Sequence, residues 1–343
     1  YMGKYKDALG AYQEAVNYFD KVSASDQKNL GRKANTLSRI AKTYNKLGET
    51  EKRKQTLQDA IKIGEQLENK TFLAEVYKTS ASMYYDNKEY ADAKIYYQKA
   101  YEAYQKLGNR SEQIYALANV ANLTVLLEND FAKAETLFNQ AIKLAQEDKD
   151  DNAIAYCYRR IGDLQLNKGN TQKAQEYFEN ALKIAQKIQD KGLETSSLLS
   201  LGNIHATRGN FPKSKEFYEL ALKTAQETND KTSEISALSG LGWLNLVSGN
   251  YPKAQEMYSK GLELSKKTDN IWGIASLYGD MANLAISMGD YKKAEWLTKQ
   301  SDSIYRKLDS KESLVSNQMI SGRLAYFQGN FEKSLKDFQE ASD

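Results

Sequence analysis

The side chains that most often carry out catalysis or bind metals are scarce in this chain. His205 is the only histidine and Cys157 the only cysteine in 343 residues. This excludes the helical HExxH motif, zinc sites built on several histidines, and any intramolecular disulfide. A lone cysteine also fits a reducing compartment, so we expect a cytoplasmic protein.

A Cys–His dyad would require the thiol of Cys157 to lie beside the imidazole of His205. The two residues fall near opposite ends of two neighbouring predicted helices, which separates them by about eight residues of helix rise, or ~12 Å. We therefore interpret Cys157 as a small buried apolar residue and His205 as a packing residue.

Nucleotide chemistry and paired-acid chemistry lack their usual patterns as well. The sequence contains no GxxxxGK[ST] loop, and no predicted strand leads into a GxGxxG turn. The acidic pair Asp150 and Asp151 lies in a predicted turn between helices, where aspartate commonly caps the helix that follows. We predict no catalytic residue, no metal ligand and no cofactor, and an enzymatic function of the chain itself is the least supported hypothesis.

The charge distribution argues against two classes of partner. Lys and Arg number 48 against 45 Asp and Glu, a formal charge of +3, and the two signs are interleaved along the chain. A nucleic-acid-binding surface needs a basic stripe. A membrane helix needs about 20 consecutive apolar residues, far more than stretches such as residues 125–127 provide. We predict neither nucleic-acid nor membrane binding.

A short segment recurs along the whole chain and sets its organisation. GNFPKS, which begins at Gly209, returns in forms such as GNYPKA and GDYKKA. We call the first residue of each copy an anchor, and the anchors are Gly3, Gly48, Lys88, Asn129, Gly169, Gly209, Gly249, Gly289 and Gly329. The steps between anchors are 45, 40 and 41 residues and then 40 residues throughout. Such a period indicates a repeat architecture.

Each unit is predicted to contain two amphipathic helices that flank its anchor. Apolar residues recur at three- and four-residue steps on both sides of Gly209. Glycine adopts a positive φ at little steric cost, which suits a tight turn between helices. The only prolines, Pro212 and Pro252, fall just inside two predicted helix starts, where a missing N–H does no harm. The sequence therefore predicts an all-α fold.

The units resemble tetratricopeptide repeats of the longer, about 40-residue variety. That family has a Leu-Gly/Ala pair in its first helix, seen here as Ile40-Ala41, Ile161-Gly162, Leu201-Gly202, Leu241-Gly242 and Met281-Ala282. Its second helix has a small–aromatic–small pattern, seen here as Ala8-Tyr12-Ala15, Ala93-Tyr97-Ala100, Ala134-Phe138-Ala141, Ala174-Phe178-Ala181 and Ser214-Tyr218-Ala221. Small residues let paired helices approach closely, and the aromatic residue fills the gap towards the next repeat.

This resemblance implies a right-handed α-solenoid that forms a single array over residues 1–343, with about eight full units and a partial one. Tyr1 lies two residues before an anchor and Asp343 falls within a second helix. Because natural arrays end in polar capping helices, we expect the chain to be truncated at both ends. Arg53 and Asn122 occupy positions where small residues are expected, so the units around Gly48 and Asn129 should pack less regularly.

The resemblance also implies where a ligand would bind, because the first helices line the concave surface of such arrays. The residue six places before each anchor is expected on this inner face, and this column reads Lys42, Ser82, Leu123, Asp163, Asn203, Trp243, Asn283 and Arg323. Tyr156 belongs to a column thirteen places before the anchor, and Asn119 and Arg159 to a column ten places before it.

We predict a peptide-binding site on this concave face, formed by Asn203, Trp243, Asn283, Arg323, Tyr156, Arg159 and Asn119. Peptide-binding relatives use inward asparagine amides on the ligand backbone, because an amide both donates and accepts hydrogen bonds. Trp243 would hold an apolar side chain and Arg323 an acidic group. The alternatives are that these are solvated polar residues and that Trp243 packs between repeats. The Lys-Asn-Lys-Arg clamp for chaperone C-termini is not reproduced.

Two functions of different classes remain open at this stage. The first is a protein- or peptide-binding scaffold within a larger protein. The second is a regulatory array that controls an attached enzyme, because long bacterial repeats of this type resemble those fused to CHAT-type caspase-like proteases, sensor histidine kinases and peptide-sensing regulators. The sequence flanking this segment would separate them.

Overall fold

The computed structural model describes residues 2–22, 26–47, 49–68, 70–308 and 310–342. In these residues the chain forms helices joined by short turns, with no strand. The helices are α1 (Met2–Val22), α2 (Gln27–Leu47), α3 (Thr50–Gln66), α4 (Lys70–Asp86), α5 (Tyr90–Leu107), α6 (Arg110–Glu128), α7 (Phe131–Glu147), α8 (Asp151–Asn167), α9 (Thr171–Ile188), α10 (Lys191–Thr207), α11 (Phe211–Glu227), α12 (Lys231–Val247), α13 (Tyr251–Lys267), α14 (Ile271–Ser287), α15 (Tyr291–Lys307), α16 (Lys311–Phe327) and α17 (Phe331–Ser342). None of these helices is long and apolar enough to cross a membrane.

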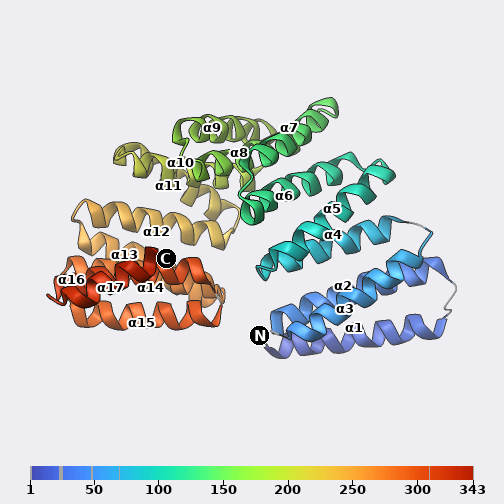
Figure 1. Cartoon of the computed structure of the whole chain (residues 1–343), viewed down its shortest axis with the longest axis horizontal. Coiled ribbons are helices and arrows are strands. Elements are labelled where there is room, and N and C mark those ends of the chain that lie inside the picture. The colour runs from blue at the N-terminus through green and yellow to red at the C-terminus, as the bar shows by residue number, and fades with distance from the viewer. Residues whose placement is uncertain (1, 23–25, 48, 69, 309, 343) are drawn as a thin grey trace. The chain divides into compact units, whose positions relative to one another are not determined.

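The helices group into two compact units. Unit 1 is Tyr1–Ala174 and unit 2 is Gln175–Asp343, so the division falls inside α9. The fold class is confirmed as an all-α solenoid of helix-turn-helix repeats, and Figure 1 shows the successive helix pairs. That residues 1–343 form one continuous array stays a prediction.

From α1 to α8, and again from α10 to α17, each helix packs against the next in sequence, and several first helices also pack against the first helix of the next repeat. In unit 2 the first helices α10, α12, α14 and α16 contact one another in that order, and each also packs against the second helix that follows it. We call the surface that these four helices share the first-helix face of unit 2. The same relation joins α2 to α4 and α6 to α8 in unit 1.

The small residues of the repeat act as predicted, by admitting aromatic rings. The ring of Tyr218 lies between Gly202 and Gly240, where an added Cβ would come within 2.7 Å and 2.6 Å of ring atoms. Tyr258 packs in the same way against Gly242. Both rings are buried. Glycine is required at these positions by close approach rather than by backbone conformation.

The anchors adopt the left-handed conformation expected of the turn. Lys88, Asn129, Gly169, Gly209, Gly249, Gly289 and Gly329 all have φ between 51° and 78°. Of the other two predicted anchors, Gly3 lies inside α1 and Gly48 lies outside the described residues.

Capping and proline placement follow the sequence interpretation. Asp150 precedes α8, and its Oδ1 accepts a hydrogen bond from the backbone N–H of Ala153 at 3.0 Å, which confirms its predicted capping role. Pro212 and Pro252 lie in the first turns of α11 and α13, where no intrahelical N–H is lost.

One register prediction was wrong. In α6 the packed small position is Ala121, and eight residues separate it from the anchor Asn129, against seven between Gly202 and Gly209. Leu123 is therefore fully buried instead of facing the groove. Asn122 is partly exposed and donates to the hydroxyl of Tyr85 at 3.2 Å. The 41-residue step between anchors contains one extra residue, which lies within α6. The spacing of the anchors alone could not locate it.

Arg53 shows how a large charged residue is accommodated at a small position of the repeat. This residue occupies a small position of α3 yet is completely buried. Its Nη2 forms an ion pair with Glu89, and its guanidinium lies 5.4 Å from the ring centroid of Tyr84. The remaining nitrogens, Nε and Nη1, have no hydrogen-bond partner among the described residues.

Candidate functional site

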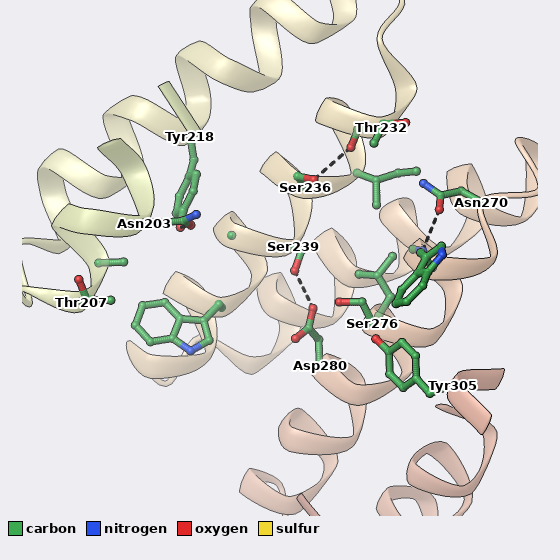
Figure 2. A pocket seen from close by; sticks show the side chains of 17 residues that line it. Asn203, Thr207, Tyr218, Thr232, Ser236, Ser239, Asn270, Ser276, Asp280 and Tyr305 are labelled. Carbon is green, nitrogen blue, oxygen red and sulfur yellow. Dashed lines mark hydrogen bonds between the residues drawn. The ribbon is translucent and has the colours of Figure 1, made fainter. Parts of the chain in front are cut away.

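A pocket of about 660 Å³ opens on the first-helix face of unit 2. Its walls come from α10, α12 and α14, with single tyrosines from α11 and α15, as Figure 2 shows. The floor of α12 and α14 carries small residues, Ser236, Ser239, Gly240, Gly273 and Ser276. This volume lies within the range of sites that hold small ligands or several side chains of a peptide.

Two of the predicted residues, Asn203 and Trp243, line this pocket. Asn203 is exposed on α10, and its Oδ1 accepts a hydrogen bond from the hydroxyl of Tyr218 at 2.5 Å. Figure 2 shows the two side chains meeting at one side of the pocket. Because the buried Tyr218 ring is held between two glycines, it fixes the amide and leaves its NH₂ group available to a ligand.

Trp243 lies on α12 and is 37% exposed. Its ring makes an edge contact with Phe211 of the preceding repeat, at 6.0 Å between centroids. One edge of Trp243 therefore packs between repeats, while the rest of the indole borders the pocket, where it could contact a ligand.

Asn283 and Arg323 lie outside the pocket and pair with each other. Nη1 of Arg323 on α16 donates to Oδ1 of Asn283 on α14 at 2.7 Å. Arg323 is exposed and Asn283 partly so. The structure therefore divides the predicted row into two pairs of residues, one at the pocket and one beyond it.

One of the residues that line the pocket is an acid that the sequence analysis did not select. Asp280 lies partly buried on α14, and its Oδ2 accepts a hydrogen bond from the hydroxyl of Ser239 at 2.6 Å. Figure 2 shows this contact joining α12 to α14, with Ser276 and Tyr305 beside the carboxylate. Among the described residues no Lys, Arg or His forms an ion pair with it. Burial raises the pKa of Asp280 to about 6, although the Ser239 hydrogen bond opposes this.

The charge of Asp280 contributes to the raised pKa values of two tyrosines. The pKa of Tyr258 on α13 and that of Tyr305 on α15 are both raised, chiefly by burial and further by this carboxylate. The hydroxyl of Tyr258 is buried and has no hydrogen-bond partner among the described residues. The acid thus lies partly buried in a pocket that combines small polar residues with aromatic rings.

The sequence model of the tetratricopeptide repeat matches residues 34–66, 72–147, 116–187 and 193–267, which together exceed half of the chain. The chain belongs to the tetratricopeptide repeat family. No curated protein matches its sequence. The resemblance inferred from the Leu-Gly pairs and the small–aromatic–small patterns is confirmed.

Solved structures share the fold of this tetratricopeptide repeat protein. The apo form of the quorum sensor NprR from B. thuringiensis is 14% identical, with a TM-score of 0.65 over 100% of this chain and 97% of NprR. A Rap protein complexed with Competence and Sporulation Factor is 16% identical, with a TM-score of 0.59 over 90% of this chain and 99% of its own. A signal transduction ATPase with a tetratricopeptide repeat sensor from Pyrococcus horikoshii is 18% identical, with a TM-score of 0.60 over 98% of this chain and 52% of its own. These identities establish similarity of fold alone.

The other three predicted residues of the tetratricopeptide array lie together in unit 1. The hydroxyl of Tyr156 on α8 donates to Oδ1 of Asn119 on α6 at 3.4 Å. Nη1 of Arg159 donates to Oδ2 of Asp163 at 3.2 Å, and Arg160 donates to the Tyr156 hydroxyl at 3.2 Å. These polar groups therefore bond to one another, and Asn119 also lines a separate pocket of about 380 Å³.

Sequence reasoning missed Asp280, Trp272 and Tyr305, which complete the pocket in the tetratricopeptide array. A signal for Asp280 was present, because it is the only charged residue in the helix Ile271–Ser287. Trp272 is 43% exposed and its ring lies 5.9 Å from that of Tyr305. Its place one residue after a helix start gave no sign that it borders a pocket.

The two residues weighed for catalysis have packing environments. His205 is buried and stacks on Phe217 at 5.3 Å between ring centroids. Burial, helped by Lys213 and Arg208, lowers its pKa and keeps the imidazole neutral. Cys157 is fully buried, and burial raises the pKa of its thiol to about 12. A thiol that stays protonated is a poor nucleophile.

Proposed function

We propose that this chain is a peptide- or protein-binding module and that an extended segment of its partner lies along the first-helix face of unit 2. The observation that carries the proposal is the pocket of about 660 Å³, in which an oriented amide, an exposed indole and small floor residues converge. Clefts with a largely apolar lining and a few placed polar groups are the usual form of binding sites.

Three of the predicted residues of unit 2 contact the ligand in distinct ways in this proposal. The free NH₂ of Asn203 donates to a backbone carbonyl of the ligand, and Trp243 covers an apolar side chain. Asn283 and Arg323 lie further along the face, where Arg323 exchanges its bond to Asn283 for an acidic group of the partner. The Rap protein in complex with Competence and Sporulation Factor shares this fold, which supports the proposal by analogy.

A random dodecapeptide display library, selected on the full chain, supplies ligands to test this site. For a synthetic peptide from that selection, Trp243→Ala should weaken binding by roughly 2 kcal/mol, as expected when a buried aromatic contact is truncated. The double variant Asn203→Ala/Asn283→Ala should weaken it by about 1 kcal/mol, one modest hydrogen-bond contribution.

Trp296→Ala is the matched control, because Trp296 is 55% exposed on α15 and does not line the pocket. It should leave the affinity unchanged. Full affinity in both Trp243→Ala and the double asparagine variant would rule out this face as the binding site and direct the search to unit 1 or to the second helices.

A second candidate function is a sensor array that regulates an attached enzyme. The match to the signal transduction ATPase with a tetratricopeptide repeat sensor favours it, since this chain spans 52% of that protein. The sequence that flanks this segment in the parent gene distinguishes the two functions. A catalytic domain encoded next to this segment would support regulation, and its absence would leave the scaffold function.

A further inference from the structure

The position of Asp280 is not dictated by the repeat. The residues at the same place in the neighbouring units, 40 positions apart, are Ser200, Gly240 and Ile320. All three are uncharged, so the helix packing is achieved there without a carboxylate. In addition, α14 is otherwise free of charged side chains. The acid therefore needs an explanation other than folding.

The surroundings of Asp280 stabilise its charge poorly. A carboxylate removed from water is costly unless it is paired with a cation or receives several hydrogen bonds. Asp280 receives one, from Ser239 to Oδ2, and Oδ1 has no partner among the described residues. On α16, the guanidinium of Arg323 donates to Asn283, one turn along α14, rather than to Asp280.

The carboxylate faces a cavity with room for its missing partner. Asp280 lines the pocket together with Trp243, Trp272 and Tyr305. Aromatic faces attract Lys and Arg groups, most strongly where water is excluded. One acid in a pocket that also carries aromatic rings is suited to an organic cation, whereas a metal ion needs several oxygen ligands.

We propose that this pocket binds an arginine or lysine side chain of an extended peptide, with Asp280 as its counter-ion. This inference rests on the proposed function, because it specifies the peptide that the same pocket accepts. The cation donates to the free Oδ1, and its alkyl stem packs against the indoles of Trp243 and Trp272. An arginine, whose planar guanidinium stacks on rings and donates in two directions, fits better than a lysine.

The dodecapeptide library is selected in parallel on the wild-type chain, Asp280→Asn and Glu263→Gln. The Asp280→Asn substitution preserves the shape of the side chain and an acceptor for Ser239 while removing the charge. Glu263 is exposed on α13 and outside the pocket, so its variant removes the same charge elsewhere. We expect arginine or lysine to be enriched at one peptide position with the wild type and Glu263→Gln, and this enrichment to disappear with Asp280→Asn.

The second measurement uses a selected peptide and its analogue in which citrulline, an uncharged isostere, replaces the arginine. The exchange should weaken binding at least tenfold for the wild type and less than twofold for Asp280→Asn. N-terminal acetylation of the peptide should have no effect, whereas a loss upon acetylation would show that the pocket takes an α-ammonium group and would overturn the assignment to a side chain.

The outcomes separate the two proposals. If peptides bind but show no basic preference, or tolerate citrulline equally with and without Asp280, the counter-ion role is overturned while peptide binding stands. If none of the three proteins selects a peptide, both proposals fail. Because the citrulline exchange leaves the protein unaltered, the proposal remains falsifiable even if a variant folds poorly.

Discussion

The charged groups on the helices of unit 1 and the acid at the pocket of unit 2 differ in their surroundings. In unit 1 Arg53 pairs with Glu89, Lys78 bridges Glu75 and Glu112, and Arg159 pairs with Asp163. In unit 2 Asp280 has a single neutral donor, Ser239. Each of the unit 1 groups thus has a partner of opposite charge within the chain, whereas Asp280 has none among the described residues.

This difference bears on which of the residues predicted for the peptide-binding site are available to a ligand. Tyr156, Arg159 and Asn119 are engaged with each other and with their neighbours. A ligand would have to replace those contacts, at the desolvation cost of each polar group. Asn119 also lines a pocket of about 380 Å³, in which Lys78 already pairs with Glu112. Asn203 and Trp243 line the pocket of unit 2, whose acid has no cationic partner among the described residues. The pocket of unit 2 is therefore the better candidate for binding.

Removal of an acid in unit 1 is expected to have the largest effect. Glu89→Gln should destabilise the chain by about 3 kcal/mol, because it leaves the buried guanidinium of Arg53 without its counter-ion. The free energy of unfolding from urea titration measures this. In the double variant Arg53→Met/Glu89→Gln most of the stability should return, and a double variant as unstable as Glu89→Gln would show that the charge is not the cause.

Removal of the acid in unit 2 should change stability in the opposite direction. Burial raises the pKa of Asp280 to about 6, above the ordinary value near 4. Its charge therefore opposes folding: the effect is absent below about pH 4, grows between pH 4 and 6, and is complete above that. Asp280→Asn should stabilise the chain by about 2 kcal/mol at pH 7.5, and by nothing near pH 4. Equal stability at pH 7.5 would contradict a poorly compensated charge.

Much of the fold could be predicted because each repeat is specified locally. The turn at Gly209 and the cap at Asp150 depend on residues a few places apart in sequence. The ring of Tyr218 packs against glycines of its own repeat and the next one, at positions that recur with the repeat. The one-residue shift in α6 could not be located, because Ala121, Asn122 and Leu123 all fit a helix and only packing against neighbours distinguishes them.

The site was predictable in part for the same reason. A fixed column selected Asn203 and Trp243, which line the pocket on the first-helix face. Asp280 was missed because its column alternates among unrelated residue types, and the pairing of Asn283 with Arg323 depends on contacts between repeats. Whether a side chain is satisfied by its neighbours is a property of three-dimensional packing that a column of residues does not contain.

The glycines of unit 2 provide a smaller test of the packing that shapes the pocket. Gly242→Ala should destabilise the chain by roughly 1–2 kcal/mol, because the new methyl group overlaps the ring of Tyr258. Gly10→Ala is the control in α1, where nothing lies within 4 Å of an added Cβ, and it should stabilise the helix by up to about 1 kcal/mol. Thermal unfolding of the two variants compares them, and a neutral result at Gly242 would contradict the proposed pairing of α12 with α13.

An effect of comparable size is expected in the pH dependence of binding to an arginine-containing peptide free of histidine. A cation binds the ionised form of Asp280, whose pKa of about 6 leaves only about a tenth of the carboxylates charged at pH 5. Affinity should therefore fall about tenfold, or about 1.4 kcal/mol, between pH 7.5 and pH 5. The titratable groups coupled to Asp280 are Tyr258 and Tyr305, whose pKa values are raised and which stay neutral throughout this range.

His205, whose pKa is lowered, is retained in Asp280→Asn, so the flat profile expected of that variant isolates the carboxylate. Fluorescence titration at half-unit steps of pH measures both profiles, and a parallel fall in the two proteins would assign the effect to a group other than Asp280.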